Sequence, residues 1–242
     1  MSVLIPRRRF NPRIPEFMDS PDPDPKVLRD DLRNLRTINR YFGGLRTVRK
    51  YASRLLQRID KSHTVEILDL ATGSADHPIA IAKFARSVGR NVRITAIERN
   101  PVTLSIARER SAPYQEISVE EGDVLSMNWS AARYDIVLCS LAVHHFTRED
   151  AVRILGAMQK VARVGFVVND LNRSWPAAWT AWLYTHLTTR NPMTLNDSYV
   201  SVLRAFTPEE LLEIAKEAGI RNPQIHTHPF FRLVLWGHND SH

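Results

Sequence analysis

The chain has 242 residues, of which 43% are hydrophobic, and no apolar run approaches the roughly 20 residues that a membrane-spanning helix needs. Its single cysteine, Cys139, excludes a disulfide framework and a cysteine zinc cluster, and it fits a protein of the reducing cytoplasm. The formal net charge of +7 is concentrated in the first fifty residues, which contain twelve Lys and Arg against six Asp and Glu. Aromatic residues do not alternate with these charges, so a solvated segment is favoured over a nucleic-acid-binding arm.

Residues 1–24 are rich in proline and charge, which predicts an extended, poorly structured leader. Apolar residues then recur at helical spacing from Pro25 to Tyr41, where a pair of glycines ends the helix. A second helix is predicted from Leu45 to Ile59. Residues 25–63 therefore form an N-terminal helical cap that is too short to be an independent domain.

Strands and helices alternate after residue 64. Strand patterns are followed by helical patterns of ten or so residues, which predicts a mainly parallel sheet with helices on both faces. We expect a doubly wound, Rossmann-like α/β fold with a seven-stranded sheet, which binds ligands at the carboxyl ends of its strands. The predicted strands are Val65–Leu70, Val92–Ile97, Ile117–Glu120, Tyr134–Ser140 and Val164–Val168, and the predicted helices are Pro78–Val88, Pro101–Arg110 and Asp150–Val161.

The last third of the chain departs from this alternation. A tryptophan-rich helix from Ser174 to about Leu187 follows the fifth strand, inside an insertion near residues 171–205 that we expect to be a lid. The run Thr207-Pro-Glu-Glu210 has the pattern of a capping box and begins a helix that ends near Gly219. Two final strands predict a closing hairpin, so residues 64–242 are expected to form one domain.

Acidic residues follow three successive strands of the predicted sheet. Asp69 lies at the end of the first strand, before a small-residue turn around Gly73, and Glu98 and Asp123 follow the second and third strands. This pattern resembles the successive motifs of class I S-adenosylmethionine-dependent methyltransferases over roughly residues 64–220. The cofactor sites that the resemblance implies are Asp69, Ala71, Thr72, Gly73, Glu98, Arg99, Asn100, Asp123, Val124 and Ser140.

The chemistry of S-adenosylmethionine suits these residue types. A carboxylate at Asp69 can meet the ammonium group of the methionine moiety, directly or through water, and Gly73 lets the backbone approach closely. Glu98 can accept both ribose hydroxyls, and Asp123 can accept the adenine amino group. A dinucleotide site would instead need G-x-G-x-x-G, whereas the corresponding positions here are Ala71, Gly73 and Asp76, and an aspartate there would repel a pyrophosphate.

A histidine pair follows the fourth strand, where the reacting methyl group is expected. Similar pairs occur in the small-molecule methyltransferases that this chain resembles, particularly those that act on quinones and phenols. His144 or His145 can therefore act as the general base that deprotonates a phenol or carboxylic acid, and the sequence does not choose between them. The structural alternative is that one histidine packs in the core or caps the next helix. No metal is predicted.

The segment after the fifth strand is expected to face the substrate. Asn169 and Asp170 are candidate acceptor-site residues, with Asp170 a third catalytic candidate, and Arg173 can meet an acidic substrate group. Trp175, Trp179, Trp182 and Leu183 share one helical face, which is more typical of a core than of a pocket. In a lid, however, the same tryptophans would suit a flat aromatic or lipid-tailed acceptor.

The leader, the Ile38–Gly44 turn and the Asp170–Trp175 run together resemble bacterial methyltransferases associated with type III polyketide synthases and quinone biosynthesis. The resemblance implies methylation, mainly on oxygen, of a phenolic lipid, polyketide or quinone-like acceptor, with the Asn39–Gly44 turn folded over the cofactor. Two other functions stay open: an RNA methyltransferase that uses the basic arm, and a non-catalytic cofactor-binding protein. Nucleic acid is the less favoured partner, and a homodimer is left open.

Overall fold

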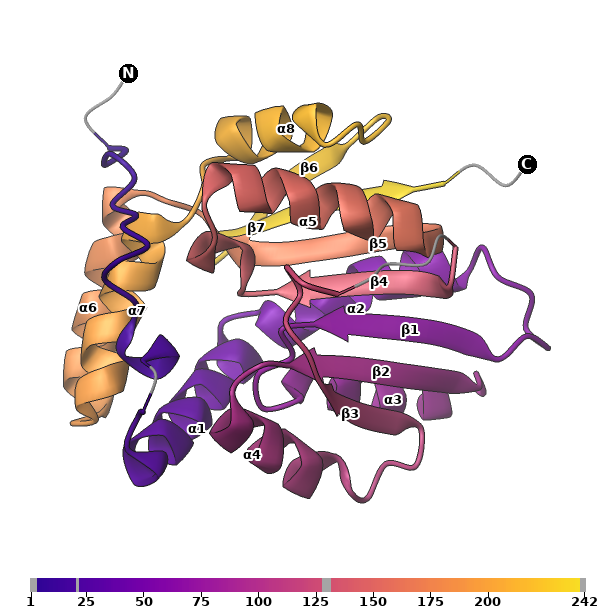
Figure 1. The fold of residues 1–242 in the computed structure, drawn as a ribbon, viewed down its shortest axis with the longest axis horizontal. Coiled ribbons are helices and arrows are strands. Elements are labelled where there is room, and N and C mark those ends of the chain that lie inside the picture. Colours follow the sequence, from indigo (N-terminus) through magenta and orange to yellow (C-terminus); the bar gives the residue numbers. More distant parts are fainter. Residues whose placement is uncertain (1–3, 21, 128–131, 240–242) are drawn as a thin grey trace.

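A central sheet organises the chain (Figure 1). The computed structural model describes residues 4–20, 22–127 and 132–239, and within them seven strands form one sheet in the order β3-β2-β1-β4-β5-β7-β6. This order is that of a doubly wound, Rossmann-like methyltransferase fold, as the sequence predicts. The strands are β1 (Val65–Leu70), β2 (Val92–Glu98), β3 (Ile117–Glu121), β4 (Tyr134–Ser140), β5 (Ala162–Leu171), β6 (Gln224–His228) and β7 (Arg232–His238).

The direction of the strands places the ligand-binding edge. Strands β1 to β5 pair in parallel, and the order reverses between β1 and β4, which is the switch point where such sheets bind ligands. Strand β7 is antiparallel to β5, and its first residue, Arg232, pairs with the last residue of β5, Leu171. Arg232 therefore lies at the same edge as the carboxyl ends of the parallel strands.

Helices cover both faces of the sheet. Helices α2 and α3 pack with one face, and α5 and α8 pack with the other (Figure 1). In β1, alternate side chains point to opposite faces, and Ile67 and Leu68 are both fully buried, as expected for a central strand. The helices are α1 (Pro25–Tyr41), α2 (Gly44–Leu56), α3 (Asp76–Ser87), α4 (Pro101–Ser111), α5 (Arg148–Val161), α6 (Trp175–Thr188), α7 (Pro192–Arg204) and α8 (Pro208–Glu217).

Several helices begin where the sequence has capping residues. Asp24 accepts hydrogen bonds from the first amides of α1, and Asn100 does the same for α4. The capping box predicted at Thr207 and Glu210 is confirmed, because each side chain bonds the backbone N–H of the other residue. No described helix has the length and apolarity that crossing a membrane would require.

The leader is more ordered than the sequence predicts. Its backbone runs beside α6 and α7 (Figure 1), and the short 3-10 turn Phe17–Asp19 contacts α7. The Arg8 guanidinium donates to the carbonyls of Arg204 and Phe146 and stacks on the Phe206 ring at 3.9 Å. These residues are held by partners that lie far away in the sequence and therefore leave no local pattern.

Helix α7 is an element that the sequence analysis does not predict. It lies inside the expected insertion and follows α6 after a short turn. Its signal is present, since Asn191 caps the helix by accepting from Thr194 N–H and Pro192 occupies the first position. The helix supplies Asp197, Ser201 and Arg204 to the pocket described below.

Candidate active site

A pocket of about 500 Å³ opens at the ligand-binding edge of the sheet. Its floor is made by the segments that follow β1, β2, β3 and β4, and its walls come from the leader, α1, α6, α7 and the start of β7. Pockets of this volume hold a ligand the size of a cofactor or a drug. The predicted cofactor residues that line it are Ala71, Thr72, Gly73, Glu98, Arg99, Asn100, Asp123, Val124 and Ser140.

The turn after β1 has a left-handed backbone at three positions. Ala71, Gly73 and Ala75 have φ values of 50°, 58° and 59°. Glycine adopts this conformation freely, whereas each alanine costs about 1 kcal/mol. Glycines are usual at the positions of Ala71 and Ala75 in the methyltransferases that the chain resembles, and this backbone explains the preference. The two alanines here keep the same turn.

Glu98 holds the turn to the next strand. Its carboxylate accepts the backbone N–H groups of Gly73, Arg99 and Asn100, each at 2.9 Å. Burial raises the pKa of Glu98, and these hydrogen bonds oppose the rise. A carboxylate has about four lone-pair sites, so Glu98 keeps capacity for a ligand hydroxyl while fixing two corners of the pocket.

Asp69 lies behind the pocket wall. It is buried, does not line the pocket, and accepts a hydrogen bond from the Thr72 hydroxyl at 2.6 Å. Burial raises its pKa to about 7, with a smaller contribution from Asp76 and Glu98. Its Oδ1 atom has no hydrogen-bond partner among the described residues, which leaves one acceptor for a water or for the edge of a ligand.

His144 forms a buried pair with Asp170. The Nδ1 atom of His144 lies 2.5 Å from Asp170 Oδ1, and the backbone N–H of His144 donates to Asp170 Oδ2 at 3.0 Å. Burial raises the pKa of Asp170, but the interaction with His144 outweighs it and lowers the pKa below its ordinary value. The carboxylate fixes the ring orientation, and His144 lines the pocket, so its other nitrogen is suited to proton transfer.

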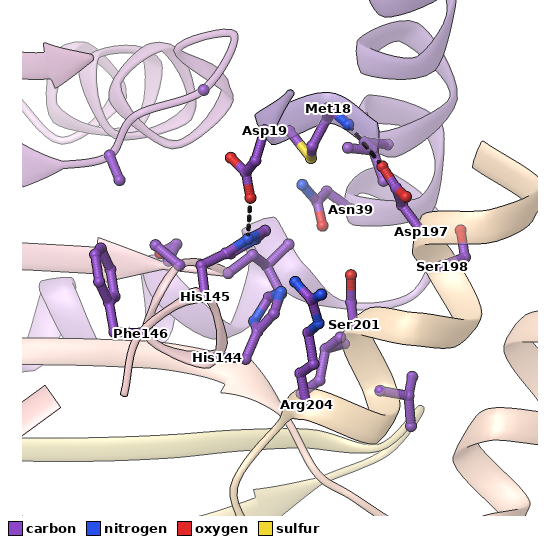
Figure 2. Close-up of a pocket in the computed structure, with 18 of the residues that line it drawn as sticks. Met18, Asp19, Asn39, His144, His145, Phe146, Asp197, Ser198, Ser201 and Arg204 are labelled. Carbon is purple, nitrogen blue, oxygen red and sulfur yellow. Dashed lines mark hydrogen bonds and ion pairs between the residues drawn. The ribbon is translucent and has the colours of Figure 1, made fainter. Parts of the chain in front are cut away.

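His145 meets different carboxylates. Its Nδ1 atom lies 2.6 Å from Asp19 of the leader and 3.9 Å from Glu16, and its ring lies beside that of His144 with centroids 4.2 Å apart (Figure 2). Burial lowers the pKa of His145, but Glu16 and Asp19 more than compensate and raise it to about 9. His145 is therefore a cation at neutral pH and cannot accept a proton there.

The leader is tied to α7 by ionic and hydrogen bonds (Figure 2). The two oxygens of Asp197 accept the backbone N–H groups of Phe17 and Met18, each at 2.9 Å. Ser201 donates to buried Glu16 at 2.6 Å, and Arg204 lies 3.4 Å from the same carboxylate. This network places the leader over the pocket as a wall.

Glu16, His144 and His145 bring one ligand atom each within 4.8 Å of the other two, a spacing that a metal ion can bridge. In the structure, Glu16 is already bound by Ser201 and Arg204, and the His145 cation is bound by Asp19. A metal ion would compete with a guanidinium and with a proton for these groups. We therefore assign the cluster to the ion-pair network rather than to a metal.

Three substrate-facing predictions are corrected. Asn169 and Asp170 are buried near the end of strand β5 and do not line the pocket. Asp170 can therefore act on a ligand only through its contact with His144. Arg173 is buried in an ion pair with Glu210 at 2.6 Å and also donates to the carbonyls of Pro6 and Ala205. It holds the leader and α8 in place and has no group free for an acidic substrate.

The tryptophan stripe of α6 does not line the pocket, and Trp175 at its start packs, partly buried, against a core cluster. Trp179 is 59% exposed and Leu183 is 52% exposed, so this face points outward. Helix α6 lines the pocket with its opposite side, through Ala181, Tyr184 and Thr185 among others. Helical spacing alone does not say which side of an amphipathic helix faces a ligand, and this explains the wrong assignment.

Several pocket residues are not predicted from the sequence. Asp19, Arg204 and Arg232 are charged residues that the fold brings together from both ends of the chain, and no local spacing connects them. His77 also lines the pocket, and its place directly after the Gly73 turn is the signal that marks it. Of the Asn39–Gly44 turn, which the resemblance predicts to fold over the cofactor, Asn39 and Phe42 line the pocket.

Part of the chain matches a known protein family. Residues 67–165 match the family model described as "Methyltransferase domain". A search of curated proteins found no significant match. Residues 67–165 therefore correspond to a methyltransferase domain, and the fold is the one found in solved S-adenosylmethionine-dependent methyltransferases.

Solved structures of the same fold include three that span most of the chain. A SAM-dependent methyltransferase from Aquifex aeolicus is 13% identical and has a TM-score of 0.58, with 90% of this chain and 99% of that chain covered. The plantazolicin methyltransferase BpumL in complex with SAH is 15% identical, with a TM-score of 0.65 and 91% of both chains covered. The magnesium protoporphyrin IX methyltransferase of Synechocystis PCC 6803 with bound SAH is 12% identical, with a TM-score of 0.57 and coverage of 93% and 91%. In other matches, the chain spans 50% to 61% of longer proteins.

Proposed function

We propose that this methyltransferase transfers a methyl group to an oxygen of a small aromatic acceptor. The observation that carries the proposal is the continuity of one pocket, which joins the polar strand ends to His144. The His144–Asp170 pair has the geometry of an oriented general base. A base is useful when the methyl acceptor carries a proton, as a phenol or a carboxylic acid does at its oxygen.

The strand-end residues fit the cofactor. Glu98 would accept the ribose hydroxyls, Asp123 the adenine amino group, and Ser140 would face the methionine moiety. The Ser140 hydroxyl is buried and has no hydrogen-bond partner among the described residues, which is expected of a group that a ligand satisfies. Asp69 would act through the Thr72 turn or through water. When bound, S-adenosylmethionine supplies an electrophilic methyl group on a sulfonium.

His144 and Asp170 would manage the proton of the acceptor. The free ring nitrogen of His144 would take the proton from the acceptor oxygen as that oxygen is methylated. Asp170 stabilises the resulting imidazolium through Nδ1. The leader, α6 and α7 exclude water and hold the acceptor in line, which is the larger part of catalysis of a direct displacement.

The apolar side chains of the pocket suit a flat acceptor. Leu35, Ile38, Phe42, Tyr184 and Phe230 come from three separate parts of the chain and line one pocket. Aromatic and branched walls bind a planar ring by area and shape. A phenolic, polyketide or quinone-like acceptor fits this lining, in line with the resemblance to methyltransferases associated with type III polyketide synthases.

The test is methyl transfer to a panel of acceptors. The protein is incubated with methyl-labelled S-adenosylmethionine and alkylresorcinols, quinols or hydroxybenzoates, and the products are separated and counted. We expect label on oxygen of at least one class and none on its O-methylated counterpart. If the cofactor binds and every acceptor stays unlabelled, this proposal fails and a non-catalytic cofactor-binding protein is favoured.

The RNA methyltransferase alternative is tested by salt-dependent RNA binding. Arg8 of the basic arm is held inside the protein by Arg204, Phe146 and Phe206, so it cannot contact phosphate in this arrangement. We expect no RNA affinity that falls steeply with salt concentration. Size-exclusion chromatography would test the homodimer, and cell fractionation would test the cytoplasmic location.

A further inference from the structure

A buried arginine at the start of β7 points to a second kind of ligand group in the pocket. Arg232 is 2% exposed and lines the pocket. It donates to Asn39 Oδ1 at 3.2 Å and to the carbonyl oxygen of Phe42 at 3.4 Å. Its Nη1 atom is buried and has no hydrogen-bond partner in the described part of the chain. A guanidinium has five N–H donors, so most of its donor capacity is unused.

The charge of Arg232 is also unpaired. No carboxylate oxygen of the described residues lies within 4.0 Å of its nitrogens. Asp170 exerts an attraction on it, but that carboxylate is already bound to His144 and to the backbone of Leu171. Burial lowers the pKa of Arg232 to about 10, which still leaves it charged at neutral pH. Buried charges without a partner are costly, and proteins keep them chiefly where a ligand supplies the opposite charge.

His77 supplies a second unsatisfied group. It stands at the second position of α3, lines the same pocket, and has no hydrogen bond at either ring nitrogen among the residues described. Burial, together with the positive charge of Arg232, lowers the pKa of His77 to about 3. The ring is therefore neutral, with one N–H donor and one acceptor. The first turn of α3 adds the positive end of a helix dipole, and its N-cap residue, Ala75, has no side chain that could satisfy the amides.

We propose that Arg232 and His77 form a subsite for a carboxylate group of a ligand. Arg232 forms the ion pair through its free Nη1 donor, and His77 contributes a ring N–H. The inference rests on the proposed function for the presence of a ligand in this pocket. Two ligands of the reaction can carry such a carboxylate: the methionine moiety of the cofactor, or an aromatic acid as methyl acceptor.

The first experiment compares two cofactor products by calorimetry. S-adenosylhomocysteine and its decarboxylated analogue differ only in the carboxylate, and both are titrated into wild type, Arg232→Gln and His77→Phe. If the subsite holds the cofactor, S-adenosylhomocysteine binds about 10- to 100-fold more weakly to Arg232→Gln, and its advantage over the analogue disappears. The exposed Arg58, which makes no side-chain contact among the described residues, gives the matched control Arg58→Gln, with unchanged affinities.

The second experiment tests the acceptor as the source of the carboxylate. With S-adenosylhomocysteine saturating, 4-hydroxybenzoate and phenol are titrated into the same proteins. If the subsite holds the acceptor, Arg232→Gln lowers 4-hydroxybenzoate affinity at least tenfold, leaves phenol unchanged, and leaves S-adenosylhomocysteine unchanged.

Either pattern supports the subsite and names its source. The inference is overturned if folded Arg232→Gln binds both carboxylates with wild-type affinity. Arg232 also anchors the Asn39–Phe42 segment, so circular dichroism checks the fold, and His77→Phe, which keeps that anchor, repeats the comparison if Arg232→Gln does not fold. Failure of the wild type to bind S-adenosylhomocysteine would count against the cofactor site itself and would be seen before any variant is compared.

Discussion

His144 and His145 are adjacent in the chain, yet their rings bind different carboxylates. His144 is held by Asp170, a carboxylate of the sheet, and presents a nitrogen to the pocket. His145 is held by Asp19, a carboxylate of the leader. Because the His145 cation cannot accept a proton, His144 is the base in the proposed mechanism, a choice that the sequence left open.

The role of His144 is tested by substitution. In His144→Gln we expect kcat to fall at least 100-fold, because general bases contribute about 10²- to 10⁴-fold, while S-adenosylhomocysteine affinity stays within about twofold. Asp170→Asn should lower kcat as well and move the acidic limb of the pH–rate profile, where a general base becomes protonated, as a positioning residue would. Full activity of His144→Gln on the acceptor identified above would contradict this role.

The His145–Asp19 pair predicts a stability that depends on pH. The folded-state pKa of His145, about 9, lies above its ordinary value of 6.5, so the protonated ring favours the folded state. This stabilisation is complete below about pH 6.5 and is lost as the pH rises through 9. In urea unfolding, Asp19→Asn should be less stable than wild type by on the order of 2 to 3 kcal/mol at pH 6.5, and the difference should shrink by pH 10.

The control for this prediction lies in the same segment. Asp22 is exposed and makes no side-chain contact with the described residues, so Asp22→Asn should leave unfolding unchanged at every pH. A difference between wild type and Asp19→Asn that persists at pH 10 would show that the pair acts through packing rather than through the proton.

At the scale of elements, the leader and α7 depend on each other. Asp197 and Arg204 of α7 are buried, and without the leader they would lose their bonds to the backbone of residues 14–18 and to the carboxylate of Glu16. The hydrogen bonds within the leader are short-range turns, such as those from Ile14 N–H to the Asn11 carbonyl and from Asp19 N–H to the Glu16 carbonyl. Each segment satisfies the polar groups that the other buries.

Arg8 tests this dependence with a neighbouring control. Arg8→Ala should lower the free energy of unfolding by about 2 to 3 kcal/mol, since three backbone carbonyls lose a charged donor and two aromatic rings lose a stacking partner. Arg7 is exposed and has no such contacts, so Arg7→Ala should change it by no more than about 0.5 kcal/mol. Equal effects of the two substitutions in chemical denaturation would refute the dependence.

The elements that the sequence predicts are those with local signals. Strand β1 has the predicted bounds, and the helices α1 and α8 follow their caps, because periodicity and capping residues act over a few positions. The strand-end residues were found because parallel strands bring their ends to one edge. Arg204 and Arg232 were missed because their hydrogen-bond partners, Glu16 and Phe42, lie about 190 positions away in the sequence. Arg173 was misassigned because its ion-pair partner, Glu210, belongs to a later helix.

At the scale of the whole molecule, the pocket joins the two ends of the chain. Its lining comes from the leader, α1 of the cap, the sheet edge, α6, α7 and β7. A ligand that touches all of these segments stabilises the folded state as a unit, by an amount that grows with its concentration above Kd. The pocket therefore couples cofactor binding to the order of the leader.

Thermal unfolding checks this coupling. At 100 times its Kd, S-adenosylhomocysteine should add about 3 kcal/mol to the free energy of unfolding and raise Tm by roughly 5 to 10 °C. Hydrogen exchange of the amides of Phe17 and Met18, which donate to Asp197, should slow in parallel. If the ligand slows hydrogen exchange in the sheet but not at these two amides, ligand binding does not stabilise the leader.

The large sequence separation of the residues that Arg8 contacts has a consequence for folding during synthesis. Arg8 meets a carbonyl 196 residues further along the chain, and Asn39 meets Arg232 across 193 residues. A nascent polypeptide that is still bound to the ribosome therefore lacks part of the pocket wall. Contacts between residues so far apart in the sequence form late and slowly. Methylation should begin only after β7 has been released, so that partly made chains consume no cofactor.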